Sequence, residues 1–237
     1  MNDRHSLLET VAGIFVPIHR DGHKFVFAFA LATLILFFIS SVLGWLGVIA
    51  TMWCAYFFRD PDRVTPIRKG LVVSSADGKV VGVEDVVPPP ELALGDKPVT
   101  RISVFLSIFD VHIARAPVGG RITRSVYVPG RFLNAELDKA SEENERRALV
   151  IETADGAHYG VVMIAGLVAR RIVTFVEEGN SVEAGDRLGL IRFGSRIDVY
   201  LPEEGRALVA PGMRAIAGET VLADLLSNEG TRPVRTS

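Results

Sequence analysis

Gly179-Asn-Ser-Val-Glu-Ala-Gly-Asp186 and Gly212-Met-Arg-Ala-Ile-Ala-Gly-Glu219 are the two stretches that decide the fold of the C-terminal third. Each carries two glycines at the same spacing, and an apolar strand follows each of them. Glycine adopts the positive φ angles that tight turns require. We therefore interpret the two stretches as two copies of one β-hairpin unit.

The chain upstream of this repeat also indicates β structure. Apolar, β-rich runs at 71–83, 101–109, 121–128, 148–153 and 158–164 alternate with turn signals. Asp77-Gly78 interrupts the first run, and Asp-Gly between two β runs is a hairpin signal. We expect a mainly β (α+β) domain. Its C-terminal part resembles the barrel-sandwich of biotinyl and lipoyl carrier domains, but neither repeat offers the lysine that those carriers modify.

The N-terminal part is different, because residues 25–58 contain no charged side chain. We predict a membrane segment that stays attached, since it is too long for a signal-peptide core. One straight helix of this length would extend about 51 Å, against a hydrocarbon core of about 30 Å. Gly44 and Gly47, close behind Ser40 and Ser41, offer a place to turn. We therefore favour a shallow helical hairpin over a tilted single span.

Basic side chains lie on both flanks of this segment, which favours the cytoplasmic side for both ends. They are Arg20, Lys24, Arg59, Arg63, Arg68 and Lys69. The predicted organisation is an N-terminal cytoplasmic segment at 1–24, a membrane segment at 25–58 and a cytoplasmic domain at 59–237.

Composition excludes several classes of function. The formal net charge of -2, from 26 basic and 28 acidic residues, gives no basic field for nucleic acid. Cys54 is the one cysteine, so the chain holds neither a disulfide framework nor a cysteine-based zinc site.

Three stretches carry candidate chemistry. Gly194-Ser195 interrupts an apolar strand, His112 follows Asp110 where another strand meets a proline, and Asp77 lies in the Asp-Gly pair. Histidine exchanges protons near neutral pH. Each stretch also has a plainer interpretation: a strand bulge, a structural histidine and a hairpin turn.

Together the three stretches resemble phosphatidylserine decarboxylase, in the short form of that family. The resemblance runs from Pro17-Ile-His-Arg-Asp-Gly22 to about Leu225. Its most specific parts are Phe109-Asp-Val-His112 with Arg115-Ala-Pro117, Ile164-Ala-Gly-Leu-Val-Ala-Arg-Arg-Ile172, and Ile191-Arg-Phe-Gly-Ser-Arg196.

The resemblance implies a chain that cuts itself and makes its own cofactor. The Ser195 hydroxyl attacks the Gly194 carbonyl and turns the amide into an ester. Elimination then frees chain 1–194, and hydrolysis of the dehydroalanine left at the start of chain 195–237 turns Ser195 into a pyruvoyl group. The two chains form a heterodimer. This group forms a Schiff base with phosphatidylserine in the membrane, releases CO2 and gives phosphatidylethanolamine, without metal or pyridoxal phosphate. His112 is the implied proton donor to the substrate, and Asp77 the implied helper of the serine-activating base.

Arg115 departs from the pattern of longer family members, which carry a second histidine at this position and use it as that base. Arginine stays protonated and is a poor base. Self-cleavage must then use His112 or another arrangement, and we hypothesise that Arg115 meets the carboxylate or phosphate of the substrate.

Two other interpretations stay open. One is a membrane-tethered barrel-sandwich adaptor or carrier-like protein without catalysis. The other is a serine hydrolase using Ser195 and His112, although the Gly-x-Ser-x-Gly elbow is missing. The sequence does not decide whether the cleaved enzyme forms a homo-oligomer.

Overall fold

The computed structural model describes residues 16–130, 144–166, 171–192, 195–202, 205–227 and 235. The chain divides into two compact units, residues 1–62 and 63–237.

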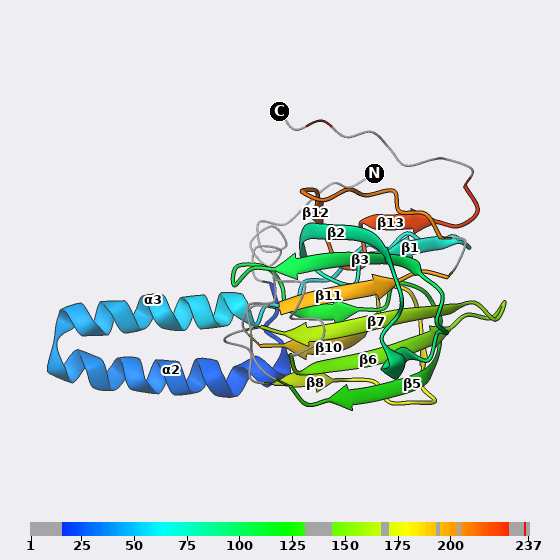
Figure 1. The fold of residues 1–237 in the computed structure, drawn as a ribbon. Coiled ribbons are helices and arrows are strands. Elements are labelled where there is room, and N and C mark those ends of the chain that lie inside the picture. The colour runs from blue at the N-terminus through cyan, green and yellow to red at the C-terminus, as the bar shows by residue number, and fades with distance from the viewer. Residues whose placement is uncertain are drawn as a thin grey trace, which may run out of the picture. The chain divides into compact units, whose positions relative to one another are not determined.

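In the described part of the first unit, from residue 16 on, two apolar helices, α2 (Arg20–Ile39) and α3 (Ser41–Phe57), are separated by the extended residue Ser40. The helices lie side by side and run in opposite directions (Figure 1). The hydroxyls of Thr33 and Thr51 are 3.0 Å apart between them. Helix α2 is long and apolar enough to cross a membrane, whereas α3 is shorter, and a single such helix is weak evidence for a membrane location.

The chain turns between these helices at Ser40. The prediction that Gly44 and Gly47 make this turn is wrong. Gly44 and Gly47 lie inside α3 and are buried. A Cβ atom at Gly44 would come within 2.2 Å of the Phe37 ring, and one at Gly47 within 2.7 Å of the Thr33 hydroxyl. The glycines therefore allow the close approach of the two helices, and they do not break the chain.

The second unit is mainly β. Its strands are β1 (Leu71–Val73), β2 (Gly78–Val86), β3 (Val99–Leu106), β4 (Ile113–Arg115), β5 (Gly120–Val128), β6 (Arg146–Glu152), β7 (His158–Ala165), β8 (Ile172–Thr174), β9 (Ser181–Val182), β10 (Arg187–Ile191), β11 (Ser195–Tyr200), β12 (Arg214–Ala215) and β13 (Val221–Asp224). One short 3-10 helix, η1 (Pro90–Leu92), lies between β2 and β3.

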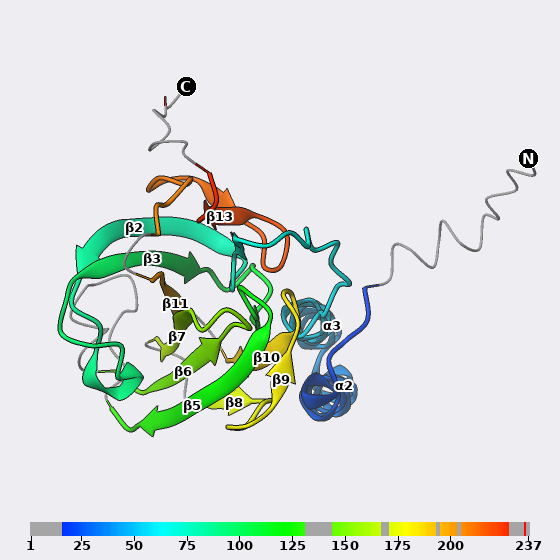
Figure 2. The ribbon, with the colours of Figure 1, turned by 90° about the vertical axis from the view of Figure 1, so that its right-hand side faces the viewer.

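Eight of these strands form one antiparallel sheet in the order β12-β2-β3-β11-β7-β6-β5-β9, which curls into a half-barrel (Figure 2). Two smaller sheets, β4-β10-β8 and β1-β13, complete the unit. The main apolar core includes Ile197 and Val199 of β11 together with Val104 of β3 and Val161 of β7. Strand β11 is thus central in both the sheet and the core.

The two glycine-containing stretches adopt the same local geometry. Gly179, Gly185, Gly212 and Gly218 have φ angles of 93°, 87°, 98° and 76°. The amide of Gly179 donates to the Ile122 carbonyl, and the amide of Gly212 donates in the same way to Val80. The prediction of positive φ is confirmed.

The prediction that each copy is a hairpin is wrong. Strand β9 pairs with β5 and β10 with β4 and β8, while β12 pairs with β2 and β13 with β1. The two strands of each copy therefore pair with strands that come earlier in the chain, and not with each other.

Asp77-Gly78 does not make the expected hairpin either, because β1 pairs with β13 and β2 with β3. Gly78 has a φ of 154°, and a Cβ atom there would lie 2.0 Å from the Phe105 carbonyl oxygen. Glycine is needed here because the main chain of β2 begins directly against the end of β3.

Candidate functional site

Ser195 is the first residue of β11 and lies in the middle of the sheet. It pairs with Leu106 of β3 on one side and with Ala165 of β7 on the other. The side chain is fully buried, and its hydroxyl has no hydrogen-bond partner among the residues that the structure describes. A buried hydroxyl without a partner costs about 1–3 kcal/mol, so Ser195 is held in an unfavourable setting. Gly194 lies outside the described residues.

His112 lies just before β4 and is also fully buried. Its Nδ1 atom is 2.9 Å from the carbonyl oxygen of Asp110. A carbonyl oxygen only accepts, so Nδ1 carries the proton, and in the neutral ring Nε2 then carries the lone pair. The His112 carbonyl accepts from the amide of Ile191 at the end of β10, four residues before Ser195.

Asp110 closes the tight turn that leads from β3 to His112. One carboxylate oxygen accepts from the amide and the hydroxyl of Ser107, at 2.9 and 2.7 Å, and the other pairs with Arg214. Burial raises the pKa of Asp110, but the hydrogen bonds from Ser107 and Arg214 outweigh it, so the pKa lies below its ordinary value. Asp110 therefore stays ionised and fixes the turn that carries His112.

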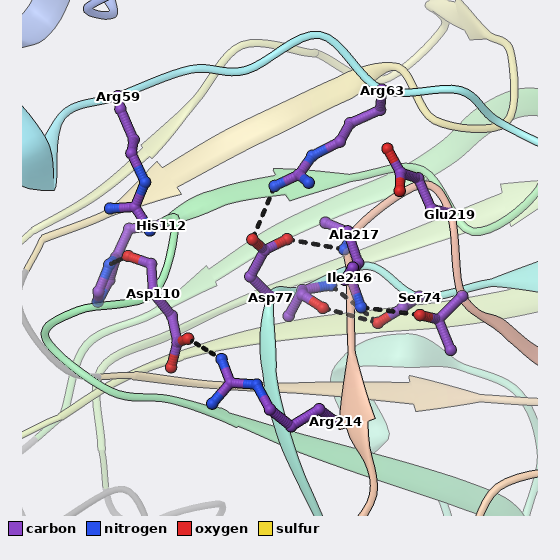
Figure 3. Close-up of polar contacts among 12 residues, drawn as sticks. Arg59, Arg63, Ser74, Asp77, Asp110, His112, Arg214, Ile216, Ala217 and Glu219 are labelled. Carbon is purple, nitrogen blue, oxygen red and sulfur yellow. Dashed lines mark hydrogen bonds and ion pairs between the residues drawn. The ribbon is translucent and has the colours of Figure 1, made fainter. Parts of the chain in front are cut away.

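Asp77 lies between a cation and a main-chain donor (Figure 3). Its carboxylate accepts from Arg63 at 2.7 Å and from the amide of Ala217 at 2.8 Å. Burial raises the pKa of Asp77 and outweighs these two donors, and the negative charge of Asp110 raises the pKa further. The ionised form is thus less favourable here than in water.

The end of β3 brings these residues together. Leu106 is the strand partner of Ser195, and the turn from Ser107 to Asp110 follows it directly. The backbone of Gly78, next to Asp77, lies against Phe105 and Leu106. Asp77, Asp110 and His112 lie in one region in Figure 3. Of the predicted residues that the structure describes, Ser195, His112 and Asp77 converge on one end of the sheet.

Arg115 lies three residues after His112, at the other end of β4. It is buried at the end of β4, and one guanidinium nitrogen donates to the Gly185 carbonyl at 2.8 Å. A Cβ atom at Gly218 would lie 3.2 Å from the Arg115 side chain. The arginine thus lies against the turns of both glycine-containing stretches.

The ion-pair partners of the two aspartates do not follow from the sequence. Arg63 has the pattern of a charge that flanks the apolar segment, yet its side chain is mostly buried against Asp77. Arg214 lies within the second glycine stretch, where nothing local sets it apart. The partners are 14 and 104 positions apart in the sequence, so no local pattern marks either pair.

A second buried charge pair lies beside the candidate site. Arg196 and Asp198 are on the face of β11 opposite to Ile197 and Val199, and their side chains meet at 2.9 Å while almost fully buried. Asp198 also attracts Arg101 of β3 electrostatically. The strand that begins at Ser195 is therefore fixed by apolar packing on one face and by charges on the other.

Among the described residues, no group of three or more His, Cys, Asp and Glu side chains could hold a metal ion.

Two of the matches to known proteins extend over most of this chain. The family model described as phosphatidylserine decarboxylase matches residues 50–223. A phosphatidylserine decarboxylase proenzyme from Nitrobacter winogradskyi is 61% identical over 221 residues, which cover 93% of this chain and 89% of that protein. The chain therefore belongs to the phosphatidylserine decarboxylase family.

Proposed function

We propose that this chain cuts itself between Gly194 and Ser195 and uses the pyruvoyl group made from Ser195 to decarboxylate phosphatidylserine to phosphatidylethanolamine. Membership of the family supports the decarboxylase activity, and the word proenzyme in the relative's name fits processing into two chains. The observation that carries the assignment of the residue is the buried Ser195 hydroxyl, which has no hydrogen-bond partner among the described residues and lies at the head of a central strand.

The surroundings of Ser195 fit a pyruvoyl group. Leu106 and Ala165 flank it on the neighbouring strands and are apolar and buried. Conversion would make Cα of Ser195 the carbonyl carbon and its Cβ a methyl group. The buried hydroxyl, which has no partner among the described residues, is thereby lost, so the apolar surroundings favour the converted residue. The group supplies an electrophilic carbonyl for the substrate amine and takes up the electron pair released with CO2.

His112 is the residue we assign to proton transfer. Its Nδ1–H group is fixed on the Asp110 carbonyl, so Nε2 is the atom that takes or gives a proton. During self-cleavage Nε2 accepts the proton of the Ser195 hydroxyl. During decarboxylation it returns a proton to the substrate carbon that has lost its carboxylate.

Asp77 and Arg115 have supporting roles in this proposal. Asp77 assists the base as a nearby negative charge, which favours the protonated form of a histidine. Arg115 is proposed to meet the carboxylate or phosphate of the substrate. Unchanged affinity for the lipid in an Arg115→Ala variant would contradict the role of Arg115.

The architecture fits the same proposal. We propose that residues 25–58, folded as the α2–α3 hairpin, lie in the membrane, with 1–24 and the catalytic domain 59–237 on the cytoplasmic side. Basic residues on both flanks support that side. The matching glycine turns support a barrel-sandwich relationship of the C-terminal part to biotinyl and lipoyl domains.

Denaturing electrophoresis with intact-mass measurement tests the cut. The purified chain should give fragments 1–194 and 195–237, the smaller one with a blocked N-terminus, and should release CO2 from phosphatidylserine. Ser195→Ala should stay whole. Ser103→Ala is the matched control. Ser103, on the neighbouring strand β3, is also a buried serine whose hydroxyl has no partner among the described residues, and this variant should still be cut.

A single uncut polypeptide in active material would overturn the proposal. An adaptor without catalysis would release no CO2. A serine hydrolase would stay uncut and release a fatty acid or a head group instead.

A further inference from the structure

An exposed apolar turn stands directly beside the candidate site. Ile108 and Phe109 connect β3 to Asp110 and His112, and they are 41% and 59% exposed. Contiguous exposed apolar side chains are a feature of surfaces that contact a partner or a membrane. The sequence pattern explains the buried neighbours Leu106 and Val111 but gives no reason for these two.

The turn bonds several of its own polar groups. The Asp110 amide donates to the Ser107 carbonyl at 2.9 Å, and the Asp110 carboxylate accepts from the amide and hydroxyl of Ser107. The Phe109 amide lies 3.4 Å from the Ser107 hydroxyl. A turn whose backbone groups are already bonded can leave bulk water at low cost. It therefore projects Ile108 and Phe109 as a preformed apolar tip.

A second turn next to it adds apolar surface and positive charge. Arg214 pairs with Asp110 across the two turns yet remains exposed, with 71% of its side chain accessible. Met213 and Ile216, on either side of β12, are exposed as well. Lys79 of β2 is exposed and pairs in register with Arg214. Apolar tips flanked by Lys and Arg are complementary to a surface of anionic lipids.

We infer that Ile108, Phe109, Met213 and Ile216, with the cations Lys79 and Arg214, form a lipid-contacting rim around the site. The inference rests on the proposed function, because it concerns how a site acting on a membrane lipid reaches its substrate. The apolar tips enter the outer part of an anionic bilayer, and the cations hold the headgroup region. The rim thereby brings the headgroup to the end of β3, where Ser195 and His112 lie.

Fluorescence of a label at position 108 tests this contact without using activity. An environment-sensitive dye is attached to Ile108→Cys in a Cys54→Ser background, and the protein is reconstituted in vesicles of phosphatidylcholine and phosphatidylglycerol with brominated acyl chains. We expect bromine to quench the label. Leaving out phosphatidylglycerol should weaken the quenching.

Val87→Cys is the matched control, since Val87 is 54% exposed and follows β2 at the end opposite to Gly78. Its label should not be quenched. Equal quenching at both positions, or none at 108, would overturn the rim. A label at 108 shielded from aqueous iodide without lipid would also overturn it, in favour of contact with a second copy of the chain.

Kinetics give an independent reading. Ile108→Ser should lower kcat/KM on phosphatidylserine in vesicles by about three- to tenfold. Self-cleavage and activity on a soluble short-chain phosphatidylserine should stay unchanged, and Val87→Ser should behave like the parent. Parent-like activity of Ile108→Ser on vesicles, or an equal loss on the soluble lipid, would refute the rim. Inactivity of the parent on both substrates would refute the proposed function.

Discussion

The buried charge pair of β11 provides a sharp test of what holds the central strand. Arg196 and Asp198 are almost fully buried, so removing one partner takes away the opposite charge that lies closest to the other. Such a loss costs about 3–5 kcal/mol, whereas replacing both partners by apolar residues of similar size is often nearly neutral. Asp198→Leu should fall in that range, because it removes the carboxylate that pairs with Arg196 and that also attracts Arg101.

Arg196→Met should cost less than Asp198→Leu, because Arg101 still attracts the remaining carboxylate. The double variant Arg196→Met/Asp198→Leu should cost less than Asp198→Leu alone. The two single losses would then be strongly non-additive, as expected for a directly bonded pair.

The assay is urea unfolding of the uncut Ser195→Ala chain, in which one polypeptide unfolds. Far-ultraviolet circular dichroism should follow the β signal, because the two tryptophans, Trp45 and Trp53, both lie in α3 and do not report on the sheet. A double variant whose loss equals the sum of the two single losses would refute the reasoning.

Three further outcomes are expected. Gly78→Ala should lower the free energy of unfolding by about 2–4 kcal/mol and impair self-cleavage, because its Cβ would lie 2.0 Å from a carbonyl oxygen of β3. Gly82→Ala is the control, because a Cβ at Gly82 would have no contact closer than 3.8 Å. Normal cutting of both variants would contradict this prediction. Asp110→Asn should lower the free energy of unfolding at neutral pH. This loss relative to the parent should vanish as the pH falls through the lowered pKa of Asp110, because a carboxylate with a depressed pKa stabilises the fold only while it is ionised. A loss that persists in acid would argue against the ionised carboxylate. Gly44→Leu should force α3 away from Phe37 and lower the thermal midpoint of tryptophan fluorescence, and an unchanged midpoint would count against close helix packing.

The strands could be predicted from the sequence because their signal is local. Alternating apolar residues and turn residues place β5 at 120–128 where 121–128 was expected, and β7 at 158–165 where 158–164 was expected. Each signal depends on a few neighbouring residues. A short stretch of sequence is therefore enough to indicate that a strand exists and roughly where it begins and ends.

Strand pairing could not be predicted in the same way, because a strand's partner depends on distant parts of the chain. The glycines at 179, 185, 212 and 218 gave the correct backbone angles, but the neighbouring strands pair with β1, β2, β4, β5 and β8 and not with each other. The Asp77–Arg63 pair shows the same limit in the candidate site. The resemblance to the family supplied Asp77, His112 and Ser195, while the partners that hold the two aspartates needed the folded chain.

The position of β11 has a consequence for the product of the proposed cut. Residues 195–237 contribute β11, β12 and β13, and every strand that these three pair with belongs to residues 1–194. The strands of the small chain therefore form sheets with strands of the large chain, and the interface between the two chains includes the protein core. The two chains should not exchange between molecules or separate by dilution, and only unfolding should release them. The new N-terminus pairs with β3 on one side and with β7 on the other, so the reactive group is held between two neighbouring strands.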